Sequence, residues 1–173
     1  MNLLTTIRGL RGNHVGMAIE ELHRSENDLA DSLLSLADLH KTDHEICHVA
    51  RDVAAWSHEH VRRLAGTGSA YGVELDAAPR DRSELLAGLK QKSAELMGHS
   101  HAPGLLLISD LRHVHRKAAG VSLDWEVLAQ TAQALEDAEL LGLAEDCHPQ
   151  TLRQLRWANS KVKELSAQVM VTG

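Results

Sequence analysis

The chain has 173 residues, enough for one domain with a substantial buried core. Only 2% of its residues are aromatic, so the core must be built from Leu, Ala, Val and Ile, a set that favours packed helices over a β-sandwich. The net charge of -6 and the lack of a basic stripe argue against binding to nucleic acid or to an anionic membrane surface.

The first half of the chain is predicted to form a helical hairpin over residues 13–66. Apolar residues recur every three or four positions from residue 13 to 40, and Asn13 is a suitable N-cap for this helix. A second periodic segment covers residues 44–65. The connection at 41–43 is so short that the two helices must be antiparallel neighbours.

The segment that follows the first hairpin is different in composition. Residues 67–102 are rich in glycine and are predicted to form a crossover along the bundle, with one short helix over 82–97. Helical periodicity resumes after the crossover and predicts a second hairpin over 103–168. We expect an interruption or kink in this hairpin at Gly120 and its turn at residues 136–137.

Other sequence features bear on the cellular location of the protein, its assembly and its cofactors. The two cysteines, Cys47 and Cys147, are too few for a disulfide scaffold and are predicted to be small buried side chains. No signal peptide or membrane-spanning stretch is present, which predicts a cytoplasmic protein without a membrane partner. The apolar run 105–108 needs a cover, which predicts a homo-oligomer. No phosphate loop or dinucleotide fingerprint occurs, so no nucleotide cofactor is expected.

Two Glu-x-x-His tetrads, Glu45–His48 and Glu145–His148, lie one hundred residues apart. Together with the two hairpins and the long crossover, they make most of the chain resemble the ferritin-like superfamily. The resemblance implies an all-α fold, a four-long-helix bundle in a single domain over residues 1–173. It also implies a core site for iron, manganese or zinc, because the dimetal members use one Glu from each of two helices and Glu-x-x-His from the other two.

Distances along the helices select among the candidate ligands. Glu26 and Glu45 differ by thirteen residues in their separation from the first turn, or roughly 20 Å along the axis, so they cannot share a metal. Glu45 and His48 are therefore predicted to lie on a solvated or salt-bridged face. Glu26 and His60 differ by only roughly 3 Å in their distance from the first turn along the helix axis, which we call their height. Both occupy core-facing positions. His148 also interrupts an apolar row, on the last helix.

Two hypotheses for this layer remain open. In the first, it binds metal in a redox or metal-handling protein, through Glu26, His60, His148 and Glu145 with His23, His58 and Glu126 within about one turn. In the second, it is a hydrogen-bonded polar layer without metal that fixes helix register. The protein would then be a non-catalytic interaction module that binds a protein partner or a second copy. Bound metal distinguishes the two hypotheses.

Overall fold

The structure is a computed structural model that describes residues 3–81 and 103–172, and the side chains of 14–81 and 103–171. Neither range contains a strand, and the all-α fold class is confirmed. The elements are four long α-helices and one short 3-10 helix: α1 (Leu3–Leu39), α2 (His44–Gly68), η1 (Ser69–Tyr71), α4 (Pro103–Leu135) and α5 (Ala138–Thr172).

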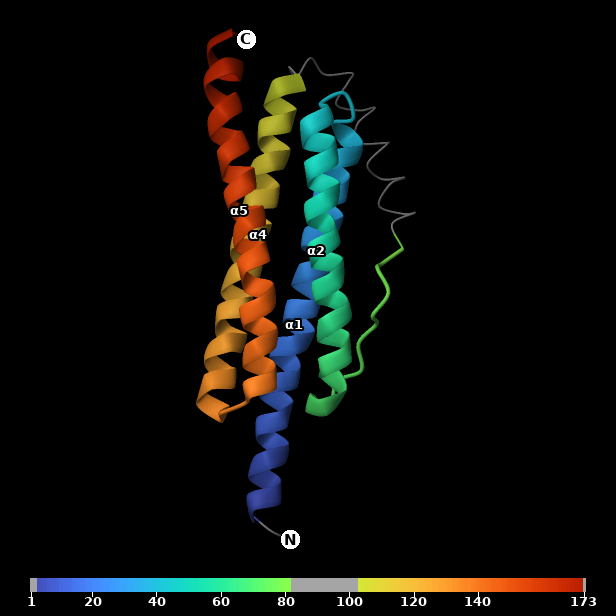
Figure 1. Cartoon of the computed structure of the whole chain (residues 1–173), viewed down its shortest axis with the longest axis vertical. Helices are drawn as coiled ribbons and strands as arrows, with labels where there is room; N and C mark the ends of the chain where they lie inside the picture. Colours follow the sequence, from blue (N-terminus) through green and yellow to red (C-terminus); the bar gives the residue numbers. More distant parts are fainter. Residues whose placement is uncertain (1–2, 82–102, 173) are drawn as a thin grey trace.

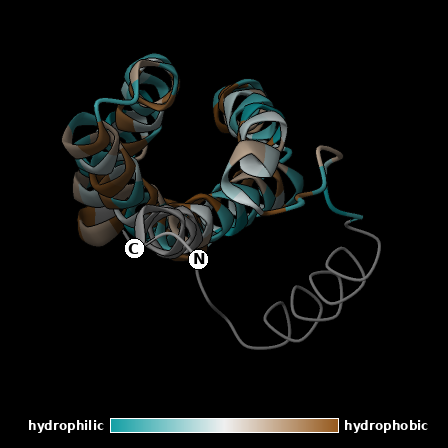
Figure 2. Cartoon of the chain, turned by 90° about the horizontal axis from the view of Figure 1, so that it is seen from below, coloured by the Kyte–Doolittle hydropathy of each residue, from teal (hydrophilic) through white to brown (hydrophobic). Residues whose placement is uncertain are grey.

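The helices pack as two pairs. In Figure 1, α2 returns alongside α1 after a short turn, and α5 returns alongside α4 after the turn at residues 136–137. Figure 2 views the helices nearly end-on, and each helix contacts its pair partner more extensively than any helix of the other pair. The pairs contact each other more extensively between α1 and α4 than between α2 and α5.

The helix α2 ends at the opposite pole from the start of α4 (Figure 1). The two helix ends that flank the predicted crossover therefore lie at opposite ends of the bundle. The short helix predicted over 82–97 lies outside the described residues. No helix of the described ranges is long and apolar enough to cross a membrane.

An aspartate side chain caps the first turn of each returning helix. Asp43 Oδ1 accepts the backbone N–H of Ile46 at 3.0 Å at the start of α2. Asp137 Oδ1 accepts the backbone N–H of Leu140 at 3.0 Å at the start of α5. These bonds satisfy backbone donors that have no partner within the helix, and so fix where α2 and α5 begin.

Two predicted helix boundaries are wrong. Asn13 does not cap α1, because that helix begins ten residues earlier at Leu3. Gly120 does not interrupt α4, which is continuous through it. Glycine costs only about 1 kcal/mol in a helix relative to alanine, so a single glycine weakens a helix without ending it.

The predicted core composition is confirmed. Most of the buried hydrophobic residues are Leu, Ala, Val and Ile, with the fully buried Trp125 as the single aromatic among them in the described ranges. Cys47 and Cys147 are both buried and free, as expected. The side chains of Trp56 and Trp157 are partly buried against this core.

The chain that leaves α2 is tied to the rest of the bundle. The Tyr71 hydroxyl donates a hydrogen bond to Asp137 at the turn between α4 and α5. The backbone of Tyr71 also approaches α1 closely, where a Cβ on Gly16 would lie 2.7 Å from the Tyr71 carbonyl oxygen. Only glycine fits at that point, so α1 and the start of the crossover are packed directly together.

Candidate functional site: a buried polar layer

A group of polar side chains interrupts the apolar core near the middle of the bundle. All four long helices contribute, and every member is at most 6% exposed: Glu26, Asn27, Ser57, His60, Ser122, Thr151 and Gln154. Burial of polar groups is costly unless they bond to one another, so their partners decide what the layer can do.

Glu26 on α1 is the centre of this layer. Its side chain is fully buried, and its Oε1 atom accepts three hydrogen bonds. The donors are His60 Nδ1 of α2 at 2.8 Å, Trp125 Nε1 of α4 at 2.7 Å and Thr151 Oγ1 of α5 at 3.1 Å. One carboxylate oxygen therefore joins all four long helices.

His60 bridges this centre to α5, and its surroundings favour the protonated ring. Its Nδ1 faces Glu26, and its Nε2 lies 3.0 Å from Gln150 Oε1. With the Gln150 amide oxygen facing the ring, a His60 that donates from both nitrogens satisfies both partners. Burial alone would lower the pKa of His60, but hydrogen bonds to Cys147 and Glu26 outweigh it and raise the pKa to about 10.

A second set of bonds continues the layer between α2 and α5. Gln154 Nε2 donates to Ser57 Oγ at 2.9 Å and to the Val53 carbonyl oxygen at 2.8 Å. Ser57 and His60 are three residues apart on α2, as Thr151 and Gln154 are on α5. Each pair therefore shares one helix face, and both faces point into the core.

The structure brings together two of the residues that the sequence singled out. Glu26 and His60 meet directly, at the common height expected from their distances to the turn. His148 is half-buried on α5, and its Nε2 hydrogen-bonds Ser122 Oγ of α4 at 2.8 Å instead. The three groups therefore do not form one directly bonded cluster.

The other candidate ligands lie farther out. Glu126 and Glu145 are exposed, because each follows a core residue and is turned about 100° away from it around the helix. His23 is half-buried, and its Nε2 lies 2.8 Å from the carbonyl oxygen of Asp76, beyond η1. His58 is also half-buried.

The first tetrad lies on the surface, as predicted. Glu45 and His48 are both exposed, and Glu45 forms an ion pair with Lys161 of α5 at 2.5 Å. The solvated, salt-bridged face expected from the height comparison is confirmed.

The polar layer is a poor fit to a metal ion. An imidazolium that donates from both nitrogens has no lone pair for a metal, and Glu26 Oε1 already accepts three hydrogen bonds. The side chains of residues 14–81 and 103–171 include no group of three or more His, Cys, Asp or Glu that could hold one. Glu26 Oε2 is buried without a partner, but a single oxygen cannot supply a metal's usual four ligands.

No protein-family model matches this sequence, and no curated protein or solved structure is significantly similar to it. Its function must therefore be inferred from its own residues.

Proposed function

We propose that this chain is a ferritin-like bundle whose central layer is held by hydrogen bonds in place of a metal, and that it acts as a non-catalytic interaction module. The bonding of Glu26 and His60 carries this proposal. These two side chains could ligate a metal, but they form hydrogen bonds between neighbouring helices instead. Such bonds favour a role in fixing the register of the helices.

The arrangement of the buried polar residues supports the ferritin-like part of the proposal. The dimetal plan needs one inward residue on each of two helices and an i, i+3 pair on each of the other two. Here the single positions correspond to Glu26 on α1 and Trp125 on α4, and the pairs to Ser57/His60 on α2 and Thr151/Gln154 on α5. Of these six residues, Glu26 and His60 alone have the ligand type that the plan requires.

One observation favours the alternative, a metal-handling protein that binds iron, manganese or zinc. Glu26 Oε2 is buried and accepts no hydrogen bond, so one coordinating atom faces the interior. That function requires His60 to lose a proton and Gln150 to turn away, at the cost of the bonds that they now make.

The interaction role is supported by an apolar patch on α4. Leu123 and Val127 are 61% and 58% exposed and lie four residues apart, so they share one face of the helix. Large exposed apolar side chains grouped in this way are suited to contact with a protein partner or a second copy of the chain.

Metal analysis of the purified protein tests the proposal. We expect protein expressed without a chelating tag, and then incubated with iron, manganese or zinc, to retain far less than one ion per chain after desalting. The His60→Ala variant should retain the same small amount. Stoichiometric metal in the wild type that is lost in His60→Ala would overturn the metal-free layer and support the metal-handling alternative.

A variant with metal ligands introduced into the polar layer, called the rebuilt variant, tests the ferritin-like arrangement of these positions. This test does not depend on whether the natural layer binds metal. The four substitutions Ser57→Glu, Trp125→Glu, Thr151→Glu and Gln154→His supply the ligand types that the plan lacks. If the layout is correct, the rebuilt variant should bind Co(II) with the visible absorption of a coordinated ion, once circular dichroism shows that it is helical. A folded rebuilt variant without bound cobalt would contradict the ferritin-like register.

A further inference from the structure

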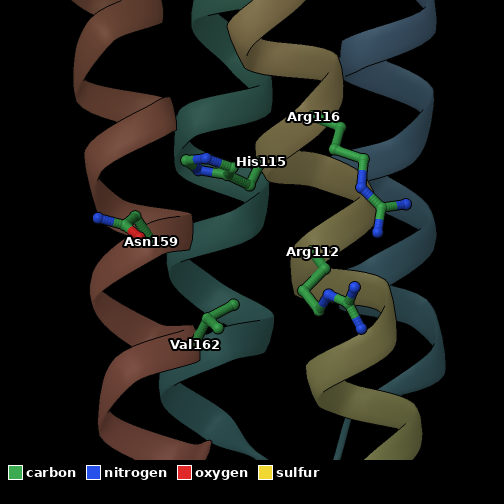
Figure 3. Close-up of a pocket in the computed structure, with 5 residues that line it drawn as sticks. All are labelled: Arg112, His115, Arg116, Asn159 and Val162. Atoms are coloured by element: carbon green, nitrogen blue, oxygen red, sulfur yellow. The ribbon is translucent and has the colours of Figure 1, made fainter.

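A shallow pocket of about 140 Å³ lies on the surface between α4 and α5, away from the polar layer. It is lined by Arg112, His115 and Arg116 of α4 and by Asn159 and Val162 of α5. Figure 3 shows the two guanidinium groups one turn apart on the side of α4 away from α5, while His115 points toward α5. The guanidinium groups therefore enter the hollow only after a change of rotamer.

The two pocket arginines differ from most other arginines of the described ranges. Each of the five at positions 24, 51, 62, 63 and 80 pairs with a carboxylate. Arg112 and Arg116 pair with none in residues 14–81 and 103–171, although the chain carries 24 acidic residues against 18 Lys and Arg. Like charges four residues apart on a helix repel, so this arrangement costs free energy while no anion is bound.

Two more cations flank the pocket on α5. Arg156 and Lys163 are exposed and lie three residues before and four residues after Asn159, on the same side of the helix. They too make no ion pair within the described part of the chain. The groove between α4 and α5 is therefore locally cationic on a protein whose net charge is -6.

The remaining lining groups add directional donors. His115 Nδ1 donates to the Leu155 carbonyl oxygen at 3.3 Å, which ties the ring to α5 and leaves Nε2 for another partner. The Asn159 amide offers two further donors. Exposed arginine side chains change rotamer within nanoseconds, so both guanidinium groups can turn toward a bound oxyanion.

We propose that this groove binds the phosphate group of a small soluble phosphate compound. Arg112 and Arg116 turn into the groove and supply paired donors, His115 of α4 and Asn159 of α5 add further donors, and Arg156 and Lys163 add favourable charge. Arginine is suited to this role because its planar guanidinium matches the oxygens of a phosphate. The site is independent of the polar layer, so it holds whether or not the core binds metal.

An NMR titration with inorganic phosphate and pyrophosphate tests this site, with sodium chloride at matched ionic strength as the reference. We expect phosphate-specific amide shifts in residues 108–119 and 155–163, with pyrophosphate binding more tightly. The Arg112→Gln/Arg116→Gln variant should weaken binding by about tenfold or more, because each charged hydrogen bond contributes more than a neutral one.

Arg153→Gln is the matched control, because Arg153 is also exposed on α5 but faces away from Asn159. It should change the affinity by less than about twofold, as expected for a screened charge outside the pocket. Equal shifts with phosphate and with chloride, or equal weakening in the Arg153→Gln and double variants, would overturn the proposed site.

Discussion

Replacing Glu26 with alanine is expected to lower the free energy of unfolding by about 3–5 kcal/mol, a large share of a typical domain's stability. The substitution leaves the His60 imidazolium in the core without its counter-charge. It also leaves the buried donors of Trp125 and Thr151 without an acceptor. Each of these losses is costly because water cannot replace the carboxylate at a fully buried position.

Chemical denaturation followed by circular dichroism measures this effect, and a double-mutant cycle with His60→Ala isolates the pair. We expect the double variant to lose less stability than the two single variants together, because the second substitution removes the charge that the first left unpaired. Glu21→Ala is the surface control, since Glu21 pairs with Arg24 in solvent and should change stability by only about 0.5 kcal/mol. A loss for Glu26→Ala no larger than for Glu21→Ala would contradict the role of the pair.

Raising the pH from about 6 to above 10 is expected to destabilise the protein through His60. Its folded pKa of about 10 lies above the ordinary histidine value of 6.5. The stabilisation is therefore fully present below the unfolded pKa and is lost as the pH rises through the folded value. A shift of this size corresponds to a loss on the order of 4 kcal/mol between neutral and strongly alkaline pH.

The stability–pH profile, taken from denaturation midpoints at constant ionic strength, checks this expectation. His60→Gln should flatten the profile between about pH 7 and 10, because it removes the titrating group. Cys147→Ala should flatten the profile only in part, because the hydrogen bond to Cys147 is the largest cause of the raised pKa of His60 but the bond to Glu26 remains. A wild-type profile as flat as that of His60→Gln would show that His60 is not charged in the folded state.

Local sequence patterns predicted most of the helices and the turns between them. Apolar spacing identified the helical segments, and the turn at 136–137 was located correctly. Counting residues from the first turn was enough to predict that Glu26 and His60 meet, because the rise per residue in a helix is fixed. The same count correctly placed Glu45 and His48 outside the core.

The partners of Glu26 could not be predicted in the same way. The apolar spacing of the last helix predicted a core row through Leu141, Ala144, His148, Leu155 and Ala158. The two alanines are buried, but the other three side chains are only half-buried. The buried row passes through Thr151 and Gln154, which a pattern of apolar residues does not select. Their burial depends on donors and acceptors from other helices, and this pairing is not visible in the periodicity of a single segment.

The bond that α4 contributes to the polar layer could not be predicted from the sequence either. The spacing predicted Trp125 as a core residue with the candidate ligand Glu126 beside it, and Trp125 does fill that core position, but its bond to Glu26 was not expected. An indole can serve there because its N–H reaches Glu26 while its ring packs in the apolar core. The signal that could have identified the layer was the repeated i, i+3 spacing of polar residues, Ser57 with His60 and Thr151 with Gln154.

The protonation state of His60 is the most direct test of whether the central layer is a closed ion pair. Nitrogen-15 NMR of the imidazole at pH 8 distinguishes an imidazolium from a neutral ring. We expect both ring nitrogens to carry protons at this pH, and their signals to be unchanged when zinc is added. A neutral His60 whose unprotonated nitrogen shifts on zinc addition would show instead that the layer is an open metal site.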